Sequence, residues 1–207
     1  MSDFYWGKKE EPPKEGAKAQ PEEKTRPSFI EVVENRIYFY SDINTDKILQ
    51  LNRNLRNKGI DLQREAMVQE REPANLFLHI QSYGGSIFAG MAGMDEIIKS
   101  IVPVHTMIDG CCASAATFLS VCGKKRFINR HAYMLIHQLS SFMWGKYEEF
   151  KDEIQNLDKI MVMIKKVYEE YTKIPTKKLE EILKHDLWFD ANECIEYGLV
   201  DEIVISK

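Results

Sequence analysis

A serine lies in a run of unusually small side chains, in the stretch IDGCCASAATF at residues 108–118. Apolar runs precede and follow this stretch, a pattern typical of a junction between a strand and a helix. The first turn of a helix has unpaired N–H groups at the positive end of its dipole, and both suit an oxyanion. Ser114 is therefore a candidate nucleophile. Two plainer interpretations stay open, because serine is common as an N-cap and small residues also permit close helix packing.

A serine nucleophile needs a general base and a carboxylate that orients the base. The sequence contains five histidines: His79, His105, His131, His137 and His185. His137 ends an apolar run, where a core histidine is also a reasonable interpretation. Spacing alone does not choose the base among these histidines, nor the carboxylate among the many aspartates.

A glycine pair, Gly84 and Gly85, stands between an apolar strand pattern and a helical pattern. Two glycines give the backbone freedom and expose N–H groups. The segment lacks the dinucleotide-binding fingerprint and the Gly-Lys-Ser/Thr ending of a phosphate loop. Taken alone, the pair is more typical of a tight turn than of a binding site.

Strand and helix patterns alternate along the chain and predict an α/β fold with a mainly parallel sheet. Strands are expected at 36–40, 75–81, 103–109, 132–138 and 199–205, and helices from Thr45, at 86–100, at 113–122, at 146–173 and from Pro175. The charged segment 56–73 is interpreted as an exposed helix extension or a loop. Ligands bind at the carboxyl ends of such strands. The turn at 82–85, the segment 110–114 and His137 all fall there.

Composition narrows the class of protein. The chain has 207 residues, 44% of them hydrophobic, which is enough for one core. Its net charge of −4 argues against nucleic acid or an anionic membrane as a partner. No membrane-spanning run or signal peptide is apparent, so we expect a cytoplasmic protein. The four cysteines lack metal-ligand spacing and are expected to be buried thiols.

The first 27 residues differ from the remainder of the chain. They hold four of the seven prolines and show neither a helical nor a strand period. We expect a disordered tail at residues 1–27 and one domain at residues 28–207.

Four segments in the same order resemble the proteolytic subunit of Clp protease. They are LHIQSYGGSIFAGMAGMDEI at 78–97, GCCASAATFL at 110–119, MLIHQ at 134–138 and HDLWFDANECIEYGLVDEIV at 185–204. The resemblance covers roughly residues 30–204. It implies the fold shared by ClpP and crotonase, with a long handle helix and a mostly helical C-terminal segment.

The resemblance also implies which residues carry the chemistry. It places the nucleophile on Ser114, the general base on His137 and the orienting carboxylate on Asp186. The oxyanion would lie between the backbone N–H groups of Gly85 and Ala115. The small residues around Ser114 would then leave space for a bound peptide, and no cofactor or metal is implied.

The implied function is that of an ATP-independent serine endopeptidase that cleaves unfolded polypeptides through an acyl-enzyme. Family members form heptameric or double-heptameric rings and receive chains from a Clp-type ATPase. A crotonase-fold acyl-CoA hydratase or lyase and a non-catalytic ring subunit are the alternatives, and a full triad argues against both. Tyr83, in place of the usual proline before the glycine pair, and the bulky LSSFMWG segment after His137 indicate a divergent branch.

Overall fold

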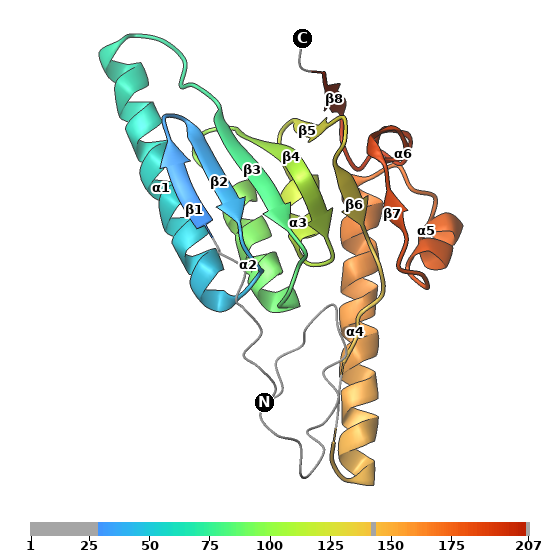
Figure 1. Cartoon of the computed structure of the whole chain (residues 1–207). Coiled ribbons are helices and arrows are strands. Elements are labelled where there is room, and N and C mark those ends of the chain that lie inside the picture. Colours follow the sequence, from blue (N-terminus) through green and yellow to red (C-terminus); the bar gives the residue numbers. More distant parts are fainter. Residues whose placement is uncertain (1–28, 142–143, 206–207) are drawn as a thin grey trace, which may run out of the picture.

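A computed structural model describes residues 29–141 and 144–205, which form one eight-stranded mixed sheet and its flanking helices (Figure 1). The elements are β1 (Phe29–Val33), β2 (Arg36–Tyr40), α1 (Thr45–Val68), β3 (Leu76–Ser82), α2 (Ile87–Ile98), β4 (Val104–Ala113), α3 (Ala116–Val121), β5 (Arg126–Asn129), β6 (Tyr133–Leu135), α4 (Tyr147–Tyr171), α5 (Thr176–Ile182), β7 (Trp188–Phe189), α6 (Ala191–Glu196) and β8 (Glu202–Val204). The tail expected at 1–27 lies outside the described residues. Within the described ranges, no helix combines the length and apolar character needed to cross a membrane.

The sheet is mainly parallel, as the alternating pattern predicts. Its strand order is β1-β2-β3-β4-β5-β8, with β6 paired to β4 and β7 paired to β6. Two pairs, β1 with β2 and β6 with β7, are antiparallel, and the remaining pairs are parallel. The α/β fold class is therefore confirmed.

Strand β4 is longer than the expected strand at 103–109 and has two different neighbours on one side. Its segment from Thr106 to Ile108 pairs with β5, and its segment from Cys111 to Ala113 pairs with β6. A register irregularity against β3 lies between Ile80 and Ser82. The second half of β4 thereby extends beyond β5 and ends beside β6.

Several expected boundaries are wrong. The helix expected at 113–122 begins at Ala116, and the strand expected at 132–138 ends at Leu135. Strands β1, β5 and β7 were not expected. The last two have only four and two residues, too few for alternation to show. Within the charged segment 56–73, α1 continues to Val68, and Leu62 on this part of the helix is buried in the core. The interpretation of this segment as a helix extension is therefore correct up to Val68.

Helices and sheet share one core, from which α4 projects (Figure 1). Alternation along β3 turns Leu78 and Ile80 into this core and His79 to the opposite face. The buried residues of α4 that hold it to the core, Ile160, Ile164 and Tyr168, all lie in its C-terminal half. That half of α4 reaches the region where β4 gives way to α3.

Candidate active site

Ser114 occupies a strained turn between β4 and α3. Its φ of 60° lies in the left-handed region, which residues other than glycine seldom adopt. The N–H of Ser114 donates to the carbonyl of Leu135 at 2.8 Å. Its own carbonyl accepts from the N–H of Thr117 at 2.9 Å and from the Thr117 hydroxyl at 2.6 Å. The turn is thus held on one side by β6 and on the other by α3.

The hydroxyl of Ser114 does not cap the helix. The N-cap of α3 is Ala115, and no side-chain capping bond is present there. Ser114 is 1% exposed, and its Oγ has no hydrogen-bond partner within the described part of the chain. A buried hydroxyl without a partner is uncommon in folded proteins and calls for an explanation. Oγ is therefore covered by neighbouring groups in this structure.

The alanines after Ser114 serve helix packing. Ala115 and Ala116 are fully buried. A Cβ added to Gly90 of α2 would lie 2.8 Å from the carbonyl oxygen of Ala115, so the two helices approach closely. Ala115 thus lies in the contact between α2 and α3. The expectation that the small residues around Ser114 leave space for a peptide stays a prediction.

A support for this turn comes from α4 and was not expected from the sequence. The Tyr168 hydroxyl lies 2.7 Å from Thr117 Oγ1, which itself donates to the carbonyl of Ser114. Both side chains are fully buried. The two residues are 51 positions apart, and neither belongs to a recognisable motif, so no sequence signal links them.

The glycine pair packs directly against Ser114. Gly84 and Gly85 have φ values of 98° and 145°, which favour glycine. Hydrogen bonds hold the turn to Ile43, whose N–H donates to the Gly84 carbonyl at 2.8 Å and whose carbonyl accepts from the Ser86 N–H at 2.7 Å. A Cβ on Gly84 would lie 2.6 Å from the Cβ of Ser114. The pair is a tight turn, and that turn forms part of the surroundings of Ser114.

Two backbone donors near Ser114 lack acceptors. Among the described residues, nothing accepts a hydrogen bond from the N–H of Gly85 or of Ala115. Most buried N–H groups are paired in native proteins, so two unpaired donors on either side of one serine are unusual. Gly85 is half-buried and Ala115 is fully buried.

His137 and Asp186 are in direct contact. Nδ1 of His137 lies 3.0 Å from Oδ1 of Asp186. His137 is 8% exposed, and its burial lowers its pKa below the ordinary value, although the Asp186 carboxylate acts in the opposite direction. A neutral imidazole whose Nδ1–H donates to Asp186 carries its lone pair on Nε2. That is the tautomer a general base requires.

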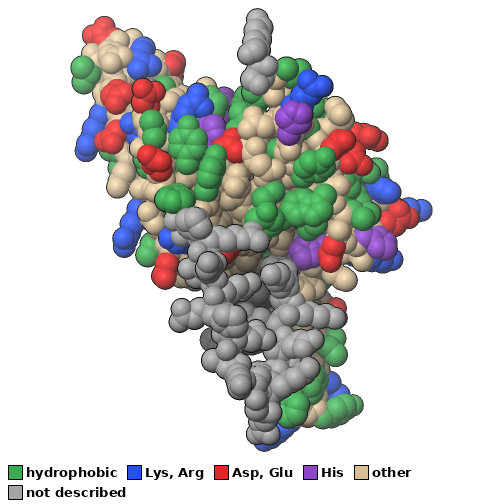
Figure 2. Space-filling model, in the orientation of Figure 1, with side chains coloured by type: hydrophobic (Ala, Val, Ile, Leu, Met, Phe, Trp, Pro, Cys, Tyr) green, Lys and Arg blue, Asp and Glu red, His purple; other side chains and the backbone are tan. Residues whose placement is uncertain are grey.

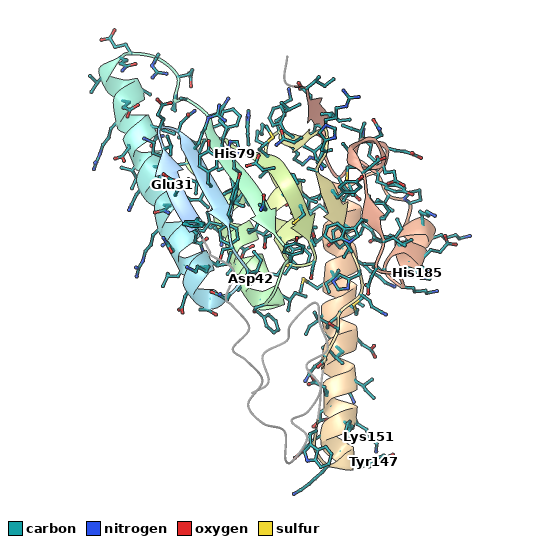
Figure 3. All side chains as sticks on the ribbon, in the orientation of Figure 1. Glu31, Asp42, His79, Tyr147, Lys151 and His185 are labelled. Carbon is teal, nitrogen blue, oxygen red and sulfur yellow. The ribbon has the colours of Figure 1, made fainter. Side chains whose placement is uncertain are left out.

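Two backbone hydrogen bonds position this pair. The N–H of Gln138, next to His137, donates to the Leu183 carbonyl at the end of α5 at 2.7 Å. The N–H of His185 donates to the Ile182 carbonyl at 3.0 Å and continues the turn toward Asp186. Figure 3 shows His185 at this turn, on the outside of the molecule. The His137 segment and the Asp186 segment are therefore tied together by their backbones.

The structure brings two of the three predicted side chains into direct contact. His137 and Asp186 touch, and the backbone of Ser114 is bonded to Leu135, two residues before His137. Oγ of Ser114 makes no hydrogen bond to His137 in the described structure. Such bonds are often long or absent before substrate binds.

Cys112, Cys122 and Cys194 do not offer a competing nucleophile. Burial raises the pKa of Cys122 and of Cys194 to about 12 and raises that of Cys112 further, so these three thiols stay protonated at neutral pH. Across residues 29–141 and 144–205, no group of three or more His, Cys, Asp or Glu side chains could hold a metal ion.

Comparison with known proteins agrees with the resemblance. A family model described as Clp protease matches residues 33–207. An ATP-dependent Clp protease proteolytic subunit 2 from Treponema denticola is 32% identical over 172 residues, which are 80% of this chain and 84% of that protein. A proteolytic subunit 1 from Chlamydia muridarum is 34% identical over 131 residues, 61% of this chain and 68% of that protein. A proteolytic subunit from Marchantia polymorpha is 33% identical over 141 residues, 67% of this chain and 70% of that protein.

Proposed function

Because this chain belongs to the Clp protease family, we propose that it is a serine endopeptidase subunit that cleaves polypeptides inside a self-compartmentalised protease. The observation that carries the proposal is the contact between the buried His137 and the exposed carboxylate of Asp186, beside the strained turn of Ser114. A neutral histidine oriented by a carboxylate, next to a serine whose hydroxyl caps nothing, is the arrangement that acyl transfer needs.

The reaction follows from these groups. Ser114 Oγ attacks the carbonyl carbon of the scissile peptide bond, while Nε2 of His137 takes the hydroxyl proton. Asp186 holds the imidazole in place and stabilises the imidazolium that forms. The unpaired N–H groups of Gly85 and Ala115 would bind the oxyanion without reorganisation. His137 then gives its proton to the leaving amine, and water releases the acyl group by the reverse path.

The assembly is the second part of the proposal. The relatives carry the name ATP-dependent Clp protease, whereas this sequence has no Gly-Lys-Ser/Thr phosphate loop. We therefore assign ATP hydrolysis to a separate Clp-type ATPase and expect short peptides to be cleaved without ATP. Heptameric rings of this chain, stacked in pairs, would enclose the sites.

A fluorophosphonate probe tests the chemistry, because it labels an activated serine covalently. We expect one label per chain, mapped by mass spectrometry to Ser114. Ser114→Ala should abolish labelling and lower peptide hydrolysis by up to about 10⁶-fold, as expected when a nucleophile is lost from such a unit. His137→Ala should lose a similar factor, and His131→Ala, at an exposed position, serves as the matched control.

The outcomes separate the alternatives. A crotonase-type hydratase or a non-catalytic ring subunit would leave Ser114 unlabelled in a folded, assembled sample. Substantial hydrolysis by purified Ser114→Ala would reject the nucleophile, and loss of turnover in His131→Ala would reject His137 as the base.

A further inference from the structure

The carbonyl of Ser114 and the N–H of Ala115 belong to the same peptide group. A peptide group is planar and almost always trans, so its C=O and its N–H point in opposite directions and can only turn together. Whatever fixes the Ser114 carbonyl therefore also fixes the direction of the Ala115 N–H, which is one of the two donors proposed for the oxyanion.

Thr117 fixes this carbonyl with two hydrogen bonds. Its Oγ1 donates to the carbonyl of Ser114 at 2.6 Å, and its backbone N–H donates at 2.9 Å. A threonine bond of this kind is common in helices and carries little weight alone. Here, however, the Tyr168 hydroxyl of α4 lies 2.7 Å from Thr117 Oγ1. Because Thr117 uses its one proton at the carbonyl, Tyr168 is the donor, and the three groups form one directed chain of hydrogen bonds.

This chain of hydrogen bonds is closed to water. Ala115, Thr117 and Tyr168 are 0% exposed, whereas charged side chains lie on the surface, mostly toward the margins of the face that Figure 2 shows. In a buried chain each hydrogen bond polarises the next and strengthens it by about 10–30%. The bonds that the Ser114 carbonyl accepts therefore draw electron density from the Ala115 N–H and make it a stronger donor.

The second proposed donor is held in a different way. The N–H of Gly85 shares a peptide group with the Gly84 carbonyl, which accepts from the N–H of Ile43 at 2.8 Å. This support runs from backbone to backbone, so replacing a side chain does not remove its donor. Each of the two oxyanion donors thus belongs to a peptide group whose carbonyl is held, and for Ala115 the hold includes side chains.

We propose that Thr117 and Tyr168 are positioning residues of the active site, which aim and strengthen the Ala115 N–H toward the oxyanion of the tetrahedral intermediate. The inference rests on the peptidase function proposed above. The negative charge develops only as Ser114 Oγ attacks, so the donor acts more strongly on the transition state than on bound substrate. Loss of a whole oxyanion donor costs about 10²–10³ in kcat, and a donor that is weakened and misaligned should cost less, about tenfold, with little change in KM.

A stable analogue of the tetrahedral intermediate tests the donor directly. The probe is a short peptidyl trifluoromethyl ketone labelled with ¹³C at the ketone carbon. Ser114 Oγ adds to that carbon, its proton passes to His137, and the ketone oxygen becomes the oxyanion. The ¹³C shift of this hemiketal, followed against pH, gives the pKa of its oxygen. Thr117→Val should raise that pKa by about 1, a tenfold weaker preference for the charged form, and Tyr168→Phe by about half as much. Thr117→Ser keeps the hydroxyl and should retain the wild-type value.

Ser120→Ala is the matched control. Ser120 is 1% exposed, and its Oγ donates to the carbonyl of Thr117, three residues earlier in α3, at 3.0 Å. That peptide group carries no proposed oxyanion donor, so Ser120→Ala should leave the hemiketal pKa unchanged even if it lowers Tm. Equal shifts in Ser120→Ala and Thr117→Val would mean that both hydroxyls only support α3, and would overturn the positioning role.

The same measurement separates this inference from the peptidase function. If the wild-type protein forms the hemiketal on Ser114, an unchanged pKa in Thr117→Val rejects the positioning role and leaves the peptidase function standing. A folded wild-type protein that forms no hemiketal would reject both. If Thr117→Val does not fold, Tyr168→Phe decides, since it keeps the ring contact with Phe118, and an unshifted pKa in that variant rejects the contribution of α4.

Discussion

The hydroxyl of Tyr168 tests whether the turn at Ser114 is supported from α4. Thr117 Oγ1 has one proton, which it donates to the Ser114 carbonyl. In the 2.7 Å contact between the two hydroxyls, Tyr168 must therefore be the donor. Burial raises the pKa of Tyr168 and keeps that proton in place. Tyr168→Phe removes the donor and leaves the packing of the ring on Phe118 intact.

The expected cost follows from the hydrogen bonds that are lost. Tyr168→Phe removes one buried bond and should lower the free energy of unfolding by about 1 kcal/mol. For a chain of this size that corresponds to a fall in Tm of about 2–4 °C. Thr117→Val should cost about 1–3 kcal/mol, because it removes the side-chain bond to Ser114 and leaves the Tyr168 hydroxyl buried without its acceptor.

Combining the two changes measures their coupling. The double variant Thr117→Val/Tyr168→Phe should be less destabilised than the sum of the single variants, because no hydroxyl is left unpaired. Urea unfolding gives the three free energies. Peptide hydrolysis should show a lower kcat with little change in KM for Thr117→Val, since the serine carbonyl loses a fixed partner. Additivity within about 0.3–0.5 kcal/mol would show that the hydroxyls act independently and would refute the supporting role.

Two further predictions concern the base and the glycine turn. Because burial lowers the pKa of His137, which must be neutral to act, kcat/KM should persist below pH 6.5 and fall only through that lower pKa. Asp186→Asn removes the influence that raises this pKa, so the acidic limb should move to still lower pH while kcat falls by about 10⁴. A limb at or above pH 6.5 in the wild-type profile would contradict the assignment. Gly84→Ala should destabilise the fold by about 1–3 kcal/mol from backbone strain alone and lower kcat, because its Cβ would press on Ser114. Thermal unfolding of Gly84→Ala and of the wild-type protein measures this cost, and equal stability of the two would show that the turn tolerates a side chain.

The sheet was predictable where its elements were long enough to show a period. The strands around Leu78 and Ile108 and the helices between them follow directly from alternation and amphipathic spacing. Strand β7 has two residues and carries no period, so it was missed. The support from Tyr168 to Thr117 joins chain segments whose proximity depends on how α4 docks. Neither residue shows this contact in its local pattern.

The candidate site was predictable only in part from the residues themselves. Small side chains near Ser114 indicated that another group approaches the backbone closely. The sequence did not distinguish a bound peptide from a packed helix, and the structure shows that Ala115 contacts helix α2. The choice of His137 and Asp186 came from the resemblance, and the two side chains are 3.0 Å apart. The catalytic roles of these residues stay predictions.

The structure also shows why a histidine beside an aspartate is not by itself a catalytic signal. His79, which is labelled in Figure 3, lies on β3. Its Nδ1 is 3.0 Å from Asp109, the same arrangement as in the His137–Asp186 pair. Its Nε2, however, accepts from Arg36 at 3.0 Å, so the lone pair that a base would use is already engaged. The Asp109 carboxylate also accepts from the Tyr40 hydroxyl at 2.5 Å, which completes a polar cluster that joins β2, β3 and β4.

At His79 the far side of the ring is therefore occupied by Arg36. An arginine guanidinium can only donate hydrogen bonds, so this contact fixes Nε2 of His79 as the acceptor. His137 follows β6, two residues after Leu135, whose carbonyl accepts the N–H of Ser114. In the proposed mechanism, the charge that accumulates at His137 would be stabilised by the Asp186 carboxylate. The hydrogen bond that Nε2 of His79 accepts from Arg36 therefore argues against His79 as the general base, although both histidines contact an aspartate.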